Sequence, residues 1–127
     1  MNELFIPYEL ALLAKEKGFD EPCFAYYDLY GHYHFNISDD TNDVVSITNG
    51  LAIDAAPLYQ QIVDWFREKH HIIIDISYDF MCYDVSVYDG DVHVKLQSSL
   101  KEGAPYCFTE YYDAMDKAIQ EAFKLIP

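Results

Sequence analysis

The chain has 127 residues, of which 51% are hydrophobic and 17% aromatic, which is enough to fill one core and atypical of a disordered protein. Eight basic residues against 22 acidic ones give a formal net charge of −14, which repels nucleic-acid phosphates and anionic lipid. No apolar run approaches the roughly 20 residues of a transmembrane helix. We therefore expect a single acidic domain over residues 1–127 that binds neither nucleic acid nor membrane.

The N-terminus and the cysteines indicate the compartment. The first residues lack the basic start and the long apolar stretch of a signal peptide. Cys23, Cys82 and Cys107 are odd in number and far apart in sequence, a pattern typical of reduced thiols. Together these features predict a cytoplasmic protein.

The first predicted element is a helix over residues 7–17. Pro7 suits the first helical turn, where its missing N–H costs nothing, and Gly18 suits the left-handed position just past the end. A hairpin is predicted next, because apolar residues alternate with polar ones over residues 33–37 and residues 23–29 are rich in aromatics. Its turn is expected at Tyr30 and Gly31.

The middle of the chain combines a polar stretch with an amphipathic one. Three aspartates between residues 39 and 43 indicate a surface loop, and Asn49-Gly50 favours a small hairpin over residues 44–53. A helix is predicted over residues 57–69, where Trp65 and Phe66 belong to one apolar face and are expected in the core.

Residues 71–97 predict three strands. The alternation of apolar residues changes phase, which requires a turn near residues 79–81, and Asp89-Gly90 marks a second tight turn. Thr109 is expected to cap a last helix over residues 110–125. The predicted fold class is α+β, with three helices packed on a mainly antiparallel sheet of about five strands in the order α-β-β-α-β-β-β-α.

Three stretches carry a resemblance to other proteins: residues 15–27, residues 56–70 with the sequence APLYQQIVDWFREKH, and residues 111–114 with the helix that follows. They resemble small proteins of unassigned function carried by phages, prophages and conjugative elements of gut Bacteroidales. The resemblance spans most of the chain apart from residues 38–55 and 78–105. It implies a mobile-element context and supplies no activity, cofactor or catalytic residue.

His32 and His34 are the candidate metal ligands. Residues two apart on a strand share a face, so both rings could reach one ion, with Asp28, His70, His71 or His93 as the third ligand. The other interpretation is a pair of solvent-facing histidines beside a turn. Because the motif has no fixed third ligand, we expect no metal and no other cofactor.

Tyrosines are the most distinctive feature of the first hairpin. Four of the 12 tyrosines lie there, namely Tyr26, Tyr27, Tyr30 and Tyr33. Strand alternation places Tyr26 and Tyr30 on one face and Tyr27 on the other, so they cannot all enter one core. Tyrosine is enriched at protein interfaces, because it buries a large area and tolerates water. The alternative is a sheet covered by helices on both faces.

The sequence contains no recognisable catalytic constellation, and we expect a non-enzymatic module that binds a protein partner, either a basic protein or a second copy in a weak homodimer. One alternative is a small metal-dependent enzyme using His32 and His34. A second alternative is a DNA mimic that inhibits a host DNA-binding protein, with Glu110, Asp113 and Asp116 supplying phosphate-like spacing.

Overall fold

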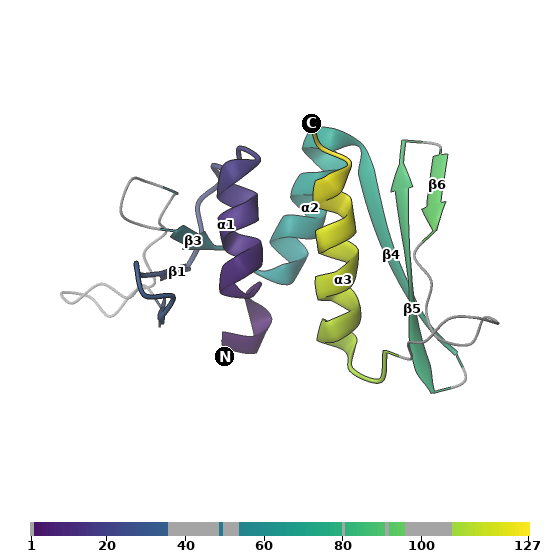
Figure 1. The fold of residues 1–127 in the computed structure, drawn as a ribbon, viewed down its shortest axis with the longest axis horizontal. Coiled ribbons are helices and arrows are strands. Elements are labelled where there is room, and N and C mark those ends of the chain that lie inside the picture. Colours follow the sequence, from purple (N-terminus) through teal and green to yellow (C-terminus); the bar gives the residue numbers. More distant parts are fainter. Residues whose placement is uncertain (1, 36–48, 50–53, 80, 91, 96–107) are drawn as a thin grey trace. The chain divides into compact units, whose positions relative to one another are not determined.

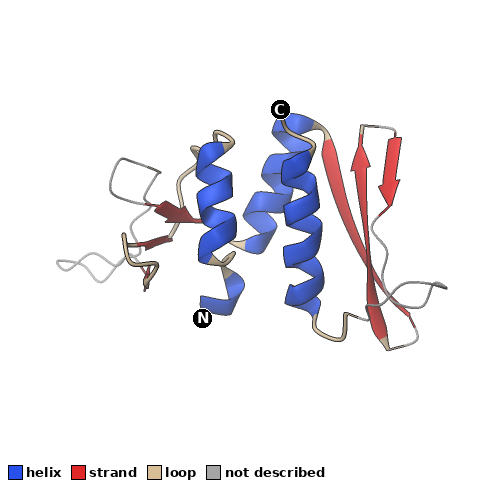
Figure 2. Ribbon diagram, viewed as in Figure 1, coloured by secondary structure: helices blue, strands red, loops and turns tan. Residues whose placement is uncertain are grey.

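The computed structural model describes residues 2–35, 49, 54–79, 81–90, 92–95 and 108–127. The elements in chain order are η1 (Asn2–Leu4), α1 (Tyr8–Glu16), β1 (Ala25–Tyr27), β2 (Tyr33–Phe35), β3 (Asp54–Ala56), α2 (Tyr59–His70), β4 (Ile72–Asp79), β5 (Cys82–Asp89), β6 (Val92–Lys95) and α3 (Tyr111–Lys124) (Figures 1 and 2). The chain divides into two compact units, residues 1–62 and 63–127. The predicted α+β class and its antiparallel pairing are confirmed, with the described strands distributed over two sheets of three.

The first unit contains the sheet β2-β1-β3, in which both pairings are antiparallel. Tyr27 pairs with Tyr33 across the predicted hairpin, and Ala25 pairs with Ala56 of β3. The strand β3 was not expected from the sequence. Helix α1 packs on β3, and Leu10 and Ala14 of the helix and Ala55 of the strand are all buried.

The end of α1 forms as its sequence predicts. Gly18 has a φ of 93°, in the left-handed region that glycine adopts without cost. The N–H of Phe19 donates to the carbonyl of Ala14 at 2.9 Å, and that of Gly18 donates to Lys15 at 3.1 Å. This pair of bonds is a Schellman motif, and it places Phe19 in the core at 1% exposure.

Two polar contacts join β3 to the α1 region of the same unit. Lys15 Nζ lies 2.9 Å from Oδ1 of the buried Asp54. The Asn49 side chain donates to the Phe19 carbonyl at 2.8 Å and accepts from the Ala55 N–H at 2.7 Å. Asn49 thus links two segments that are far apart in sequence, a role that its place in an Asn-Gly pair did not indicate.

The second unit contains the sheet β4-β5-β6, which is antiparallel throughout. The predicted turns are present. Met81 has a φ of 64° between β4 and β5, and Gly90 has a φ of 62° between β5 and β6. Helix α3 packs on β4 and β5 (Figure 1). Val85 and Val87 are buried two residues apart on one face of β5.

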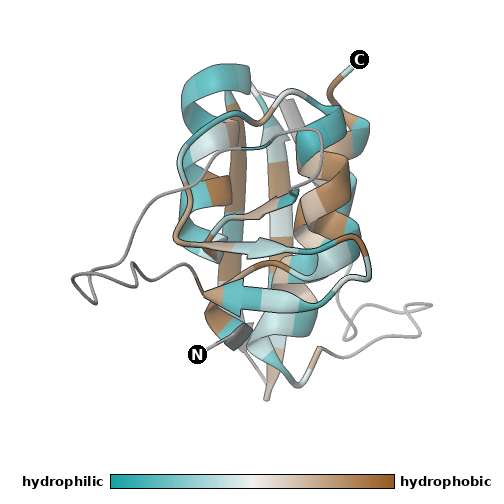
Figure 3. Ribbon diagram, turned by 90° about the vertical axis from the view of Figure 1, so that its left-hand side faces the viewer, coloured by the Kyte–Doolittle hydropathy of each residue, from teal (hydrophilic) through white to brown (hydrophobic). Residues whose placement is uncertain are grey.

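Aromatic side chains fill the core of the second unit. Trp65 and Phe66 are buried, and the Phe66 ring centroid lies 4.9 Å from that of Phe123 on α3, which confirms the core expectation for this pair. The helical ribbons alternate between hydrophobic and hydrophilic colours around their turns in Figure 3. This amphipathic pattern is what a helix with one buried face requires.

Other expectations are corrected or lie outside the described residues. Glu110, rather than Thr109, is the N-cap residue of α3, and its side chain makes no capping hydrogen bond. The hairpin predicted over residues 44–53 lies outside the described residues, apart from Asn49. Cys23 is a free thiol, but Cys82 forms a disulfide, so the expectation of reduced cysteines is wrong for Cys82. None of the described helices has the length and apolar character needed to cross a membrane.

Candidate functional site

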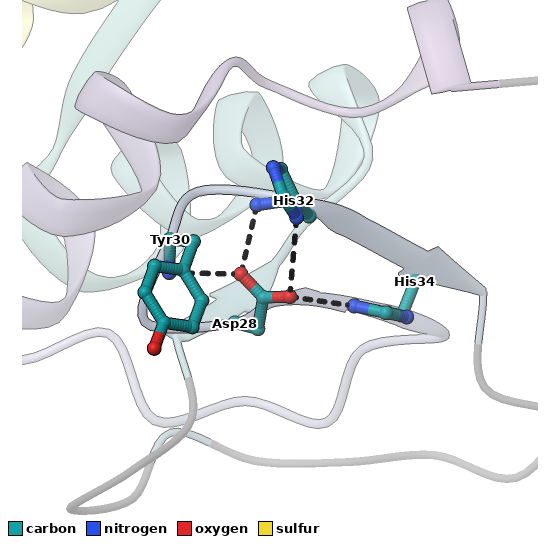
Figure 4. Close-up of polar contacts among 4 residues, drawn as sticks. All are labelled: Asp28, Tyr30, His32 and His34. Atoms are coloured by element: carbon teal, nitrogen blue, oxygen red, sulfur yellow. Dashed lines mark hydrogen bonds and ion pairs between the residues drawn. The ribbon is translucent and has the colours of Figure 1, made fainter.

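The connection between β1 and β2, residues 28–32, is a turn built around Asp28, and we call it the hairpin tip. The Asp28 N–H donates to the His32 carbonyl, and the Gly31 N–H donates to the Asp28 carbonyl, both at 3.0 Å. Oδ1 of Asp28 accepts the backbone N–H groups of Tyr30 at 2.9 Å and His32 at 3.0 Å (Figure 4). An aspartate that bonds backbone groups ahead of it is a frequent turn-forming device, so the tip has a defined conformation.

The other carboxylate oxygen of Asp28 faces the two histidines. Oδ2 lies 2.9 Å from Nε2 of His34 and 3.7 Å from Nδ1 of His32 (Figure 4). The hydrogen bond with His34, followed by the bonds from the backbone of His32 and Tyr30 and the nearby His32 ring, lowers the pKa of Asp28 to about 2. A carboxylate with this many donors stays ionised under physiological conditions.

The arrangement of the histidines bears on the metal hypothesis. Of the four third-ligand candidates, Asp28 is placed beside both His32 and His34. The His70 ring packs against Trp65 with centroids 4.7 Å apart, His71 precedes β4 with a φ of 56°, and the His93 side chain is not described. Among the described residues, no group of three histidine, cysteine or acidic side chains is arranged to hold a metal ion.

Two of the four candidate tyrosines are structural. Tyr27 is 8% exposed, its hydroxyl donates to the Ile6 carbonyl at 2.7 Å, and its ring centroid lies 5.4 Å from that of Tyr8. Tyr33 is half-buried 5.5 Å from the Phe5 ring, and its buried hydroxyl has no hydrogen-bond partner among the described residues. Burial raises the pKa of Tyr33. Tyr27 therefore belongs to the core, which corrects its place among the expected interaction residues.

The other two tyrosines lie nearer the solvent. Tyr26 is half-buried and stacks on the His34 ring, with centroids 5.0 Å apart and planes 17° from parallel. Tyr30 is 86% exposed at the hairpin tip, beside Leu29 at 69%. The sequence analysis missed Leu29, although an apolar residue next to a predicted turn was a usable signal. Leu29 and Tyr30 are thus the exposed apolar pair at the hairpin tip, with Tyr26 half-buried on β1 and Phe24 46% exposed just before that strand.

Cys23 is not poised for catalysis. It is buried, and its thiol lies 3.6 Å from the Glu21 carbonyl. Burial raises the pKa of Cys23 to about 12, the Glu21 charge adds to this effect, and a hydrogen bond with the Gln61 side chain opposes it. Since the thiolate is the nucleophile, this protonated thiol is inert at neutral pH.

Comparison with protein-family models, with curated proteins and with solved structures gives no match for this chain. The functional interpretation therefore depends on the geometry described above.

Proposed function

We propose that this protein is a non-enzymatic, acidic protein-interaction module of a phage or other mobile element, and that the hairpin tip contacts its partner. The observation that carries the proposal is the exposure of Leu29 and Tyr30 on a turn fixed by Asp28. A turn already held by hydrogen bonds loses little conformational freedom on binding, and tyrosine suits a surface that alternates between water and a partner.

The charge of the chain decides which partners fit. At −14, two copies repel one another, so a homodimer is weak and must depend on apolar contact. A basic protein is attracted by the net negative charge. Added salt separates the two cases. It strengthens a homodimer, because it screens the repulsion between like charges, and it weakens binding to a basic partner, because it screens their attraction.

Sedimentation velocity at low and high salt tests this function. We compare the wild type with Tyr30→Ser and with a control, Leu12→Gln, which removes a partly exposed apolar side chain from α1. Self-association of the wild type and of the control is expected to increase with salt. Tyr30→Ser is expected to self-associate less than the wild type at either salt concentration. If the wild type is monomeric at both salt concentrations, the partner must be another protein. In that case the wild type and Leu12→Gln should retain a specific protein from host lysate, and Tyr30→Ser should not. Equal retention by both variants would contradict a role for the tip.

A cytoplasmic location is part of this proposal. Disulfides persist mainly in oxidising compartments, so the redox state of Cys82 in the native host tests it. A reduced Cys82 supports the cytoplasmic location, and a persistent disulfide opposes it.

A small metal-dependent enzyme using His32 and His34 is the second candidate, because both rings lie beside Asp28, although these three side chains are not arranged to hold an ion in this structure. Its test is a zinc titration of the wild type and of His34→Gln by calorimetry. Stoichiometric binding that His34→Gln removes would support it, and the absence of binding would eliminate it.

A further inference from the structure

A second exposed aromatic surface lies in the other unit, where the β4–β5 turn meets the start of α3. Tyr78 and Tyr83 are cross-strand partners with ring centroids 4.9 Å apart. Tyr111 lies 5.6 Å from Tyr83, and Tyr112 lies 5.2 Å from Tyr111. We call these four side chains the tyrosine row, and each ring in it touches the next.

The tyrosine row is positioned by backbone hydrogen bonds. The Tyr83 N–H donates to the Phe108 carbonyl at 2.8 Å, which attaches the segment before α3 to the edge of β5. This bond fixes where α3 begins relative to the β4–β5 hairpin. The rings of Tyr83 and Tyr111 are therefore held together by main-chain geometry as well as by their own contact.

Much of this surface is open to solvent. Tyr78 is 61% exposed, Tyr111 is 42% exposed, and Met81 in the adjoining turn is 79% exposed. The buried core of the unit is supplied by other side chains, such as Val85 and Phe66, so the tyrosine row is not needed to fill it. Exposed neighbouring apolar side chains of this kind indicate a binding surface.

Among the described residues, the exposed charges nearest Tyr111 in sequence are negative. Glu110 and Asp113 lie within two residues of Tyr111 at the start of α3, and both are exposed. The helix N-terminus contributes about half a positive charge, which two carboxylates exceed. Lys117, one turn further along, lies 3.2 Å from Glu121 and is paired there. A cation is thus favoured at this surface, and a phosphate is not.

We propose that the tyrosine row binds an arginine-bearing segment of a partner protein. The face of an aromatic ring attracts a cation within about 6 Å of its centroid, and the planar guanidinium also stacks on the ring. Contiguous rings offer an arginine a stacking surface, and the two exposed carboxylates at the start of α3 and the net charge of −14 favour a cation there. This surface belongs to a different unit from the hairpin tip, so the inference stands whether or not the tip binds a partner.

Titration of the intact protein with a capped hexa-arginine peptide tests the inference, with hexa-lysine as a comparison. In NMR spectra, the peptide is expected to shift the ring resonances of Tyr78 and Tyr111 more than those of Tyr8, a half-buried tyrosine of the first unit. At about 150 mM salt, where distant charges are screened, Tyr78→Ser and Tyr111→Ser should each weaken hexa-arginine binding about two- to fivefold. Leu12→Gln is the control, because it changes an exposed apolar side chain outside both proposed binding surfaces, and it should leave the affinity unchanged.

The tested substitutions are at exposed positions, and circular dichroism verifies that each variant folds. Binding of equal strength in all variants would show attraction by net charge alone and would overturn the inference. Hexa-lysine binding that equals hexa-arginine binding, no binding of either peptide, or shifts confined to other residues would also overturn it. The shift measurement uses the wild type, so a variant that fails to fold leaves the test intact.

Discussion

Replacing Gly31 by alanine should destabilise the first unit more than the same change at Gly18. Both glycines have positive φ, 80° and 93°, so both variants incur the left-handed penalty of about 1–2 kcal/mol. Alanine also restricts the unfolded chain more than glycine does, which raises the free energy of unfolding by about 0.4–1 kcal/mol in each variant. A methyl group at Gly18 would meet nothing within 4 Å, so Gly18→Ala should cost about 0.5–1 kcal/mol.

The Gly31 position carries an additional steric cost. A methyl group there would lie 3.0 Å from Cδ2 and 3.2 Å from Cε2 of Tyr8, inside ordinary contact distance. The Tyr8 ring packs against buried Tyr27, which restricts its movement. The added methyl group must therefore displace either the Tyr8 ring or the backbone of the turn. Overpacking of this kind costs about 1–3 kcal/mol, and Gly31→Ala should therefore cost about 2–3 kcal/mol in total.

Urea unfolding followed by far-ultraviolet circular dichroism measures both costs. The contact with Tyr8 is isolated by repeating Gly31→Ala in a Tyr8→Ala background, where its cost should fall to that of Gly18→Ala. The reasoning fails if Gly31→Ala is no more costly than Gly18→Ala, or if its cost is the same in both backgrounds.

Three further predictions concern the core, the cysteines and pH. Phe66→Ala should lower the free energy of unfolding by about 3–5 kcal/mol, because it opens a cavity against Phe123, whereas Phe66→Leu should cost clearly less; equal urea midpoints would contradict this packing. In denatured protein purified without reductant, one thiol, that of Cys23, should react with Ellman's reagent, and three should react after reduction; three thiols before reduction would contradict the disulfide at Cys82. The depressed pKa of Asp28 means that its stabilising contacts are fully present above its ordinary pKa of 3.8 and are lost as the pH falls through about 2. Carbon-detected NMR titration should place its midpoint near 2, and a midpoint near 3.8 would refute the role of the His34 bond.

The local features of the sequence determined most elements of this protein. Gly18 ended the first helix because left-handed backbone is a property of the residue itself. Asp89-Gly90 produced a turn for the same reason, and the apolar face of residues 57–69 identified Trp65 and Phe66 as core. These predictions succeeded because each depends on residues within about two helical turns.

The tertiary structure alone decided which residues are exposed together. Tyr27 and Tyr30 lie three residues apart and are equally aromatic, yet one is bonded to Ile6 in the core and the other is in solvent. The pairing of β1 with β3, and the contact of Tyr83 with Tyr111, join segments separated by many residues. Such contacts depend on how much apolar surface each distant element needs to bury, and no local pattern in the sequence records that quantity.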